Sequence, residues 1–396
     1  MKKILLITPR YPFPVIGGDK LRIYNIAKHL SSFYSLTLLS LYSTQEEEET
    51  SPEEGLFERV YKVRQPAYVS YCNAVKNFLG GKSLQTGYFF NRRLYRLVHE
   101  LAPGHDLIIA HLMRTSEYVR GLNHIPKLCE MTDAISLNYE GISKKGEKSL
   151  KEVVFGIEQK RCLKSELDCL RAFDGCVVVS GRDRQYLLKH GPFPEKVHII
   201  PNGVDYERFD YPRRHVRKGK IVFLGNMRTV QNADAASWFA KAVFPAIKRA
   251  VSDSSFWVVG AEPTAAVRAL GRIPGVIVTG RVADVAECAG DATVSVCPMR
   301  IGAGVQNKIL ESMAMGVPVV ASNLAVKGLQ VRNVLTADSP EEFKTKILHI
   351  HDDGAAAGRL AACARRFVEE NFSWQSVLSP YRDLIEGVFR LHRRQG

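Results

Sequence analysis

The feature that most constrains the fold is the alternation of short apolar runs with amphipathic stretches along nearly the whole chain. Residues 2–8 (KKILLIT) and 35–41 (SLTLLSL) have the composition of buried strands, and residues 19–33 between them repeat apolar side chains at helical spacing. Further strand-like segments follow at 105–111, 125–133 and 173–180. Strand, helix and strand in repetition predict a parallel sheet with helices on both faces.

A second series of the same kind begins after residue 215. Its strand-like segments lie at 219–226, 254–262, 275–282, 292–298 and 317–322. A segment rich in Pro, Gly and Arg, residues 201–220, separates the two series, and 396 residues exceed one ordinary core. We therefore predict an α/β protein with two Rossmann-like domains, over residues 1–205 and 215–375, and a helix over 376–396 that crosses back to the first. A ligand is expected at the carboxyl ends of the strands, in the cleft between the domains.

The formal net charge of +14 favours an anionic partner. Nucleic acid, an anionic membrane surface and a phosphate-bearing substrate all have this property. The sequence has no zinc-finger spacing, aromatic RNP stretch or long Arg/Lys tract, so we predict no nucleic-acid partner. The eight cysteines include no Cys-x-x-Cys pair, which indicates free thiols and not a metal site.

The N-terminus has a short apolar run after two lysines. This run, Ile4 to Ile7, is followed by Pro9 and Arg10 and is shorter than the roughly 7–15 residues of a secretory signal. No stretch approaches the roughly 20 apolar residues of a membrane span. We expect a cytoplasmic protein.

Residues 302–322 (GAGVQNKILESMAMGVPVVAS) combine a glycine-rich turn, a cation and an acid at the start of a helix. Gly302 and Gly304 permit close approach of the backbone to a ligand. Three backbone N–H groups follow near the positive end of the helix, those of Val305, Gln306 and Asn307. Lys308 can bind a phosphate and Glu311 can accept hydrogen bonds from paired hydroxyls such as those of a ribose. A surface Lys–Glu pair on an ordinary helix is the alternative.

The pair Gly17-Gly18 lies between the first strand and the first helix. Backbone N–H groups at such a position can approach an anion at a helix N-terminus. The segment is not Gly-x-Gly-x-x-Gly, so the dinucleotide-binding fingerprint is absent. A simple tight turn explains the pair equally well.

The order of these motifs resembles a known family. PNGVD (201–205), FLGNMR (223–228), VVGAE (258–262) and TGRV (279–282) precede the segment 302–322, which ends in GVPVVAS. This order and spacing resemble the GT-B glycosyltransferases, specifically the retaining family 4 (group 1) enzymes, which transfer sugars from nucleotide donors. The resemblance extends over nearly the whole chain and is strongest from 201 to 330. It implies a GT-B fold, with two Rossmann-like domains whose parallel sheets face each other across a cleft.

The resemblance also implies roles for particular residues. The turn Gly280-Arg281-Val282 corresponds to the one that reads the nucleotide base, Glu311 to the ribose ligand, and Arg228 to a basic residue that steadies the phosphates. The loop from Gly304 to Lys308 corresponds to the one that meets the diphosphate and the sugar. The predicted donor-binding residues are Gly17, Gly18, Gly225, Arg281, Val282, Gly304, Val305, Gln306, Asn307, Lys308 and Glu311.

The chain departs from the family pattern at one position. Family members usually carry two glutamates eight residues apart, the first of which touches the donor sugar. Ala303 stands eight residues before Glu311. Some branches of the family instead have a small residue there and a lysine three residues before the second glutamate, as Lys308 is here. The contacts with the donor sugar therefore do not carry over.

Polar residues end two of the strand-like segments of the first domain. Asp133 ends 125–133 and is predicted to be catalytic, together with Lys308 and Arg228; a helix N-cap is the alternative for Asp133. His111 ends 105–111 and is predicted, with Asp19 and Arg22, to bind the acceptor; a structural histidine is the alternative. Residues 76–101 mix basic and aromatic side chains, which fits either a membrane-contacting surface or a helix packed on the domain.

The sequence thus predicts a glycosyltransferase that moves a sugar from a nucleotide-sugar donor to a saccharide or lipid-linked acceptor, with retention, in envelope or exopolysaccharide synthesis. No Asp-x-Asp motif is present, so we expect no metal or other cofactor. The net charge suggests a peripheral location on the inner face of the cell membrane, with Lys76, Lys82, Arg92 and Arg93 as contacts. The alternatives are a nucleotide-sugar 2-epimerase of the same fold and, from a different class, a basic nucleic-acid-binding protein.

Overall fold

The structure is a computed structural model and describes residues 1–143, 150–206, 209, 215–301, 306–327, 329 and 331–395. The chain divides into two compact units. The N-terminal unit contains residues 1–202 and 377–396, and the C-terminal unit contains residues 203–376. The chain therefore leaves the N-terminal unit after Asn202 and returns to it after Ser376.

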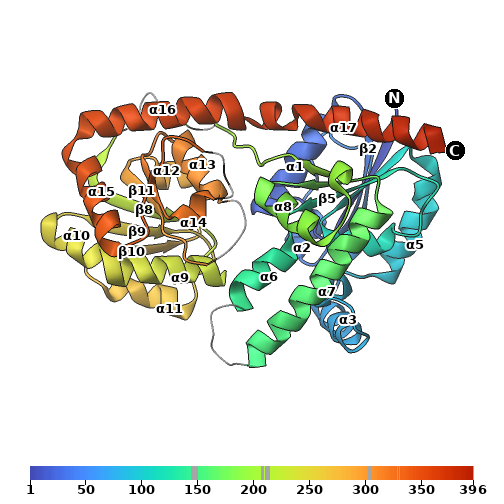
Figure 1. Ribbon diagram of the computed structural model, residues 1–396, viewed down its shortest axis with the longest axis horizontal. Coiled ribbons are helices and arrows are strands. Elements are labelled where there is room, and N and C mark those ends of the chain that lie inside the picture. The colour runs from blue at the N-terminus through green and yellow to red at the C-terminus, as the bar shows by residue number, and fades with distance from the viewer. Residues whose placement is uncertain are drawn as a thin grey trace. The chain divides into compact units, whose positions relative to one another are not determined.

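The N-terminal unit is built on a parallel sheet which, among the described residues, has seven strands in the order β3-β2-β1-β4-β5-β6-β7. The strands are β1 (Lys3–Thr8), β2 (Ser35–Tyr42), β3 (Arg59–Arg64), β4 (Leu107–His111), β5 (Lys127–Thr132), β6 (Gly175–Val178) and β7 (Val197–Ile199). Its helices are α1 (Gly18–Ser31), α2 (Gln45–Glu49), α3 (Ala67–Leu79), α4 (Leu84–Tyr88), α5 (Arg92–Leu101), α6 (Ile135–Ser143), α7 (Leu150–Ala172) and α8 (Gly181–His190). Helix α17 (Trp374–Gln395) brings the chain back to this unit (Figure 1).

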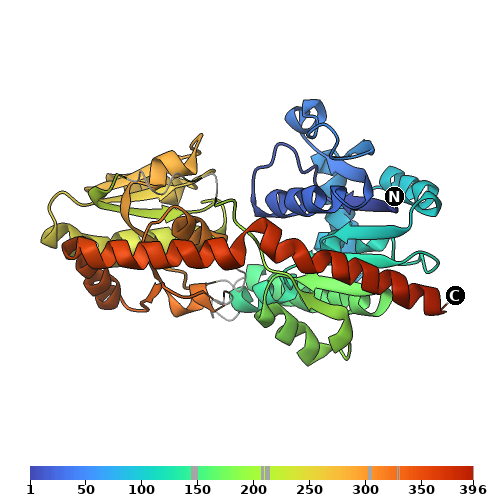
Figure 2. The same cartoon turned by 90° about the horizontal axis from the view of Figure 1, so that it is seen from above.

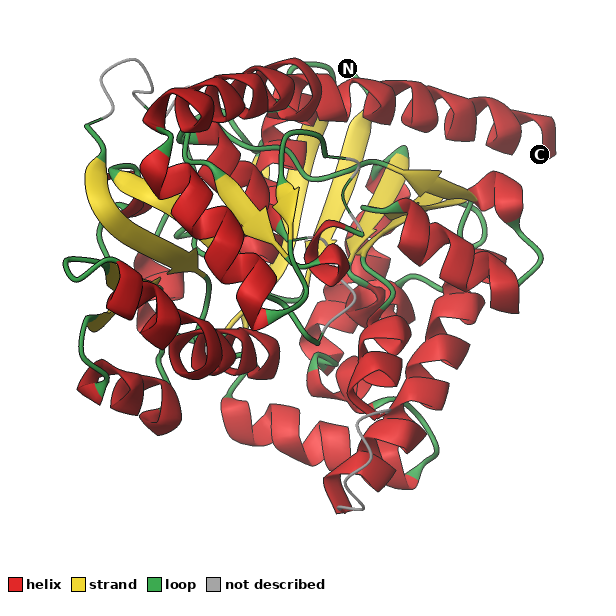
Figure 3. Cartoon of the chain, turned by 60° about the vertical axis from the view of Figure 1, so that its left-hand side comes forward, coloured by secondary structure: helices red, strands yellow, loops and turns green. Residues whose placement is uncertain are grey.

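The C-terminal unit has a second parallel sheet, and strands of both sheets are drawn in yellow in Figure 3. Its described residues form six strands in the order β10-β9-β8-β11-β12-β13. The strands are β8 (Arg217–Leu224), β9 (Ser255–Val259), β10 (Val276–Gly280), β11 (Ala292–Cys297), β12 (Val319–Ala321) and β13 (Leu335–Thr336). Its helices are α9 (Val230–Trp238), α10 (Phe244–Ala250), α11 (Ala265–Arg268), α12 (Val285–Ala289), α13 (Asn307–Ala314), α14 (Asn323–Val326), α15 (Pro340–Asp352) and α16 (Gly354–Phe372). Within each unit, helices lie on both faces of the sheet (Figure 2).

The strand order of both sheets reverses once, and this reversal locates the best place for a ligand. In the N-terminal unit the chain builds outward from β1 to β3 and then crosses to β4 on the other side of β1. In the C-terminal unit the same reversal separates β8 from β11. Because the connections on the two sides run over opposite faces of the sheet, a crevice opens at the carboxyl ends of these paired strands.

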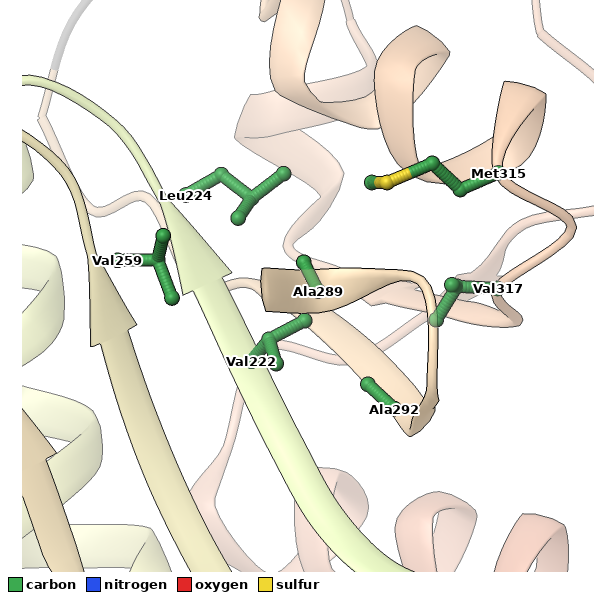
Figure 4. Packing of buried hydrophobic residues seen from close by; sticks show 7 residues of the cluster. All are labelled: Val222, Leu224, Val259, Ala289, Ala292, Met315 and Val317. Carbon is green, nitrogen blue, oxygen red and sulfur yellow. The ribbon is translucent and has the colours of Figure 1, made fainter. Parts of the chain in front are cut away.

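A cluster of buried apolar side chains fixes the elements around the reversal of the second sheet. It consists of Val222, Leu224, Val259, Ala289, Ala292, Met315 and Val317 (Figure 4). Met315 directly follows α13 and Val317 precedes β12, so this packing anchors the C-terminal end of α13 against the sheet. The N-terminal end of α13 is thereby held at the carboxyl edge of the strands.

A fully buried ion pair joins distant segments of the N-terminal unit. Arg22 of α1 and Glu130 of β5 are both 0% exposed, and they form two hydrogen bonds, Nε to Oε1 at 2.9 Å and Nη2 to Oε2 at 3.2 Å. The remaining guanidinium hydrogens go to the carbonyls of Ile200 and Pro201 and to the side chain of Asn202, each at 3.0 Å. Because the pair is bidentate and its donors are used, the cost of burying the two charges is offset.

None of the described helices is both long enough and apolar enough to cross a bilayer.

Replacing Glu130 with alanine should destabilise the N-terminal unit strongly. The change leaves Arg22 buried without its counter-charge, which typically costs about 3–5 kcal/mol of unfolding free energy. The control is Arg171→Ala, which removes an exposed ion pair with Asp168 (3.0 Å) and should cost less than about 1 kcal/mol. Urea unfolding followed by circular dichroism measures both. Equal losses in the two variants would contradict the role of the buried pair.

Candidate functional site

Polar residues gather at the carboxyl ends of β1 and β4, where the strand order of the first sheet reverses. Arg10 follows β1 and forms an ion pair of 2.8 Å with Asp19, in the first turn of α1. Gly17, with φ of 103°, and Gly18 form the turn into this helix. Burial raises the pKa of Asp19, but the charge of Arg10, followed by those of other neighbours, holds it below its ordinary value. Asp19 is therefore ionised at neutral pH.

His111 ends β4 in this cluster and has unused hydrogen-bonding capacity. Its side chain is buried, and neither ring nitrogen has a hydrogen-bond partner within the described part of the chain. Burial lowers the pKa of His111 to about 3; the nearby Asp19 opposes the shift, and Arg22 and Arg114 add to it. The imidazole is therefore neutral at pH 7, with one nitrogen able to donate and the other able to accept. A buried polar group of this kind calls for a partner such as a water molecule, an ion or a ligand.

Asp133 lies just beyond β5, at a turn where Thr132 has a φ of 68°. Its carboxylate accepts a hydrogen bond from the side chain of Asn138 at 2.9 Å. Burial raises the pKa of Asp133, and the Asn138 hydrogen bond and the charge of Arg114 oppose this rise. The sequence left open whether Asp133 caps the following helix. The structure shows that the carboxyl groups of two other residues accept hydrogen bonds from the first N–H groups there.

Two carboxyl groups from other helices hold the turn that presents Asp133. Asp183 of α8 accepts from the backbone N–H of Ala134 at 3.0 Å, and Glu166 of α7 accepts from that of Ser136 at 3.0 Å. Burial raises the pKa of Glu166 to about 8 and that of Asp183 to about 6. The sequence analysis missed both. Asp183 stands three residues after the helix-capping Ser180, a recognisable pattern, whereas Glu166 has no local signal.

Arg22, predicted to bind the acceptor, is placed differently from Asp19 and His111. Its guanidinium is fully buried and bonded to Glu130 and to the segment 200–202. This placement argues against direct contact with a ligand and indicates a role in holding the unit together. Arg114, which the sequence analysis did not name, is a further cation of the cluster. Its charge lowers the pKa values of Asp19, His111 and Asp133.

In the C-terminal unit the carboxyl ends of β8 and β9 press directly against each other. The N–H of Gly225 donates to the carbonyl of Val259 at 3.0 Å. A Cβ atom on Gly260 would lie 1.7 Å from the carbonyl oxygen of Gly225. A Cβ on Gly225 itself would lie 2.7 Å from the side chain of Asn232 and 3.3 Å from Nζ of Lys308. Gly260 therefore lets the two strand ends approach, and Gly225 leaves room for Lys308 at the end of β8.

Lys308 lies in the first turn of α13, close to the point where the strand order of the second sheet reverses. Its Nζ donates to Oδ1 of Asn232 at 2.6 Å and lies 4.9 Å from the ring centroid of Phe223. Asn232 in turn donates to the carbonyl of Asn226 at 2.9 Å, which fixes its amide. Burial lowers the pKa of Lys308, and the neighbouring Cys297 and Glu311 oppose this. An oriented ammonium group thus lies beside the positive end of a helix.

The other predicted donor-binding residues vary in how firmly they are held. Arg228 is exposed on the loop after β8, with Nη1 3.9 Å from the carboxylate of Glu262. Arg281 is exposed just beyond β10, and Val282 packs against the core cluster. Glu311 is half-buried on α13, and Gln306 and Asn307 form the start of that helix. Gly304 and Val305, like Gly302 and Ala303, lie outside the described residues.

No group of three or more His, Cys, Asp or Glu side chains in the described ranges is arranged as a set of metal ligands.

Comparison with protein families identifies the class. The chain matches the family model described as Glycosyltransferase Family 4 over residues 16–208 and the model described as Glycosyl transferases group 1 over residues 218–353. Between them these matches span most of the chain, and they confirm the predicted family: the chain belongs to the group 1, family 4 glycosyltransferases.

Solved structures of low sequence identity share the fold over their full length. A sucrose-phosphate synthase from Thermosynechococcus elongatus has a TM-score of 0.72 at 15% identity, and the match covers 99% of this chain and 100% of that one. Alr3699/HepE from Anabaena, in complex with UDP and glucose, has a TM-score of 0.69 at 15% identity, with coverages of 96% and 99%. TarM of S. aureus has a TM-score of 0.67 at 13% identity, with coverages of 98% and 99%. The GT-B fold is thereby confirmed. No curated protein sequence matches the chain.

Glu166 should make stability fall as the pH rises. Its carboxyl has a pKa of about 8 in the folded chain against an ordinary value of 4.5, so the folded state binds a proton that the unfolded state releases. The contribution is complete below pH 4.5 and is lost as the pH rises through 8, with a slope of at most about 1.4 kcal/mol per pH unit. Glu166→Gln should flatten this slope in urea unfolding between pH 5.5 and 8. The exposed control Glu341→Gln should keep it; an unchanged slope in Glu166→Gln would refute the assignment.

Proposed function

We propose that this chain transfers a sugar from a nucleotide-sugar donor, bound by the C-terminal unit, to a saccharide or lipid-linked saccharide acceptor, bound by the N-terminal unit. The observation that carries the proposal is the position of Lys308. Its ammonium group is oriented by Asn232 at the start of α13, beside Gly225, whose missing side chain leaves room for it at the end of β8. This arrangement suits a diphosphate. In support, HepE has been solved with UDP-glucose and TarM with UDP.

The charge of the departing nucleoside diphosphate is the main demand on the donor site. We assign its stabilisation to Lys308, to the N–H groups at the start of α13 and to Arg228, whose exposed side chain is free to follow the phosphates. Glu311 binds the ribose hydroxyls, and the segment Arg281-Val282 contacts the base. Because these cations belong to the chain itself, we propose that the reaction needs neither a metal ion nor another cofactor.

The acceptor site is assigned to the cluster at the ends of β1, β4 and β5. His111 has a neutral imidazole with both nitrogens available, so it can bind a sugar hydroxyl. Asp19 is an ionised acceptor of hydrogen bonds held by Arg10. Asp133, held by Asn138 and by the turn that Asp183 and Glu166 fix, faces the reacting sugar. Gly17 and Gly18 complete the donor side, with a backbone turn that admits a phosphate.

We further propose that transfer retains the anomeric configuration and serves the synthesis of an envelope or exopolysaccharide glycan. The acceptor is then membrane-bound, and the protein works at the cytoplasmic face of the cell membrane as a peripheral enzyme. The net charge of +14 supports attraction to an anionic leaflet.

Replacing Lys308 with alanine should slow turnover at saturating donor. The loss of one oriented cation at the leaving diphosphate raises the barrier by about 2–4 kcal/mol, which corresponds to about 30- to 1000-fold in kcat. Release of nucleoside diphosphate measures it. Lys241→Ala, at an exposed lysine on the helix that follows α9, is the control and should keep wild-type turnover. Full activity of Lys308→Ala would remove this residue from the reaction.

A screen of nucleotide sugars, with and without saccharide acceptors, should give a glycosylated product whose anomeric configuration equals that of the donor. Proton NMR of the product reads the anomeric coupling directly. An inverted product would overturn retention while leaving the transferase activity in place. An epimerised nucleotide sugar formed without any acceptor would favour a 2-epimerase instead.

A further inference from the structure

Helix α3 has its polar and apolar faces reversed relative to an ordinary surface helix. Its apolar side chains Tyr68, Tyr71, Val75 and Leu79 are 71%, 63%, 57% and 81% exposed. Their spacing of three, four and four residues places them on one side of the helix. Exposed apolar residues scattered singly are normal, but a continuous stripe on one helix marks an interaction surface.

The inner face of α3 is polar, and its contacts fix the orientation of the helix. Asn73 donates to the carbonyl of Phe90 at 2.9 Å, and Asn77 donates to the hydroxyl of Thr86 at 3.4 Å. A Cβ on Gly87 of α4 would come within 2.7 Å of both asparagines, so the two helices are in close contact. The stripe cannot turn inward without breaking these hydrogen bonds.

The C-terminal end of α3 is fastened as well, and this limits the apolar surface to the stripe. Arg161 of α7 donates to the carbonyl of Phe78 at 2.8 Å and lies over the ring of Phe78. Phe90 stacks on Tyr118 with a centroid distance of 5.7 Å. Of the apolar residues in 76–101, Leu79 is exposed, whereas Phe78 and Phe90 pack within the unit. The apolar surface therefore runs from Tyr68 to Leu79.

The charge around the stripe has one sign. No Asp or Glu occurs from residue 65 to residue 99. The same stretch contains five basic residues, all exposed: Lys76, Lys82, Arg92, Arg93 and Arg96. Lys76 lies on α3 itself, and Lys82 follows the Gly80-Gly81 pair after its end. An apolar stripe with basic residues at its edge is complementary to an anionic lipid surface, and the tyrosines suit the level of the head groups.

We propose that the outer face of α3 docks on an anionic membrane. The helix lies at the outer edge of the N-terminal unit (Figure 1). Docked in this way, it would lie in the plane of the interface, with Val75 and Leu79 in the acyl region and Lys76 among the head groups. This inference rests on the proposed function, because a lipid-linked acceptor would bring the enzyme to the membrane.

A cavity on the other side of α3 provides a place for the head group of such an acceptor. It has a volume of about 220 Å³, and Arg10, Glu47, Gln65, Ser70, Tyr88 and Phe89 are among its lining residues. Ser70 belongs to α3, and the ring of Tyr88 meets that of Tyr71 at 5.4 Å. Arg10 connects the cavity to Asp19 of the candidate acceptor site. The helix thus separates the proposed membrane surface from a polar and aromatic pocket.

Flotation of the full chain with vesicles tests the docking surface directly. Wild-type protein should float with vesicles of phosphatidylcholine containing phosphatidylglycerol at low salt, and less with pure phosphatidylcholine or at high salt. The double variant Val75→Glu/Leu79→Glu should bind the anionic vesicles at least tenfold more weakly. Val216→Glu is the matched control, because Val216 is 53% exposed in the C-terminal unit and outside the stripe. Equal thermal unfolding of the variants shows that each is folded.

The outcomes separate this proposal from the proposed function. If the double variant floats as well as the wild type, the proposed docking surface is wrong. The same holds if the wild type is a dimer and the double variant is a monomer that still floats, since the stripe would then be a dimer interface. Turnover of donor with a soluble saccharide acceptor should be the same in wild type and double variant, because none of the residues assigned to the donor site or the acceptor site belongs to α3. Loss of flotation with intact turnover supports the docking surface. Intact flotation without any turnover of nucleotide sugars would overturn only the proposed function.

Discussion

The buried ion pair between Arg22 and Glu130 is the interaction on which the N-terminal unit depends. It joins α1 to β5, and Arg22 extends the network to Asn202, the last residue before the chain leaves the unit. Tyr381 of α17 donates to the same glutamate at 3.1 Å, just after the chain has returned. Both crossings of the chain are therefore tied to one buried charge pair. Since burial of these charges is costly unless every donor finds a partner, a small shift in any of the joined segments is opposed by the whole network.

The backbone at the carboxyl ends of the strands is unusual in both units, and this explains how the candidate residues reach the edge of the sheets. Leu112, after β4, and Thr132, at the end of β5, have φ values of 63° and 68°, which residues other than glycine rarely adopt. These residues redirect the chain immediately beside His111 and Asp133. In the C-terminal unit the chain is redirected at Gly225 and Gly260, after β8 and β9. The two glycines lie so close together that a Cβ on Gly260 would collide with the carbonyl oxygen of Gly225. Such backbone conformations persist only when surrounding contacts hold them, and they are commonest at functional sites.

Much of the fold could be predicted from the sequence, because central parallel strands are continuous apolar runs. The segments 2–8 and 292–298 correspond to β1 and β11 within a residue or so at each end. The edge strands β3, β7 and β13 were missed, since they are short or half-exposed and lack such runs. The site could be predicted only in part. Lys308 stands in a local sequence motif and was found, whereas Glu166 binds a turn 30 residues away, and no local pattern reveals this pairing. The reversed faces of α3 were also hidden, because periodicity shows that a helix has two faces but not which one packs inward.

The discontinuity of the N-terminal unit has a consequence for the order in which the protein matures. Residues 377–396 belong to the same unit as residues 1–202, yet a ribosome makes them only after the whole C-terminal unit. The C-terminal unit is complete in sequence at Ser376, whereas Glu130 receives its bond from Tyr381 only after that point. During synthesis domains usually fold in order from the N-terminus. Here the first unit to emerge is the last to be finished, and a nascent chain cut short within α17 would carry a complete second unit beside an unfinished first one.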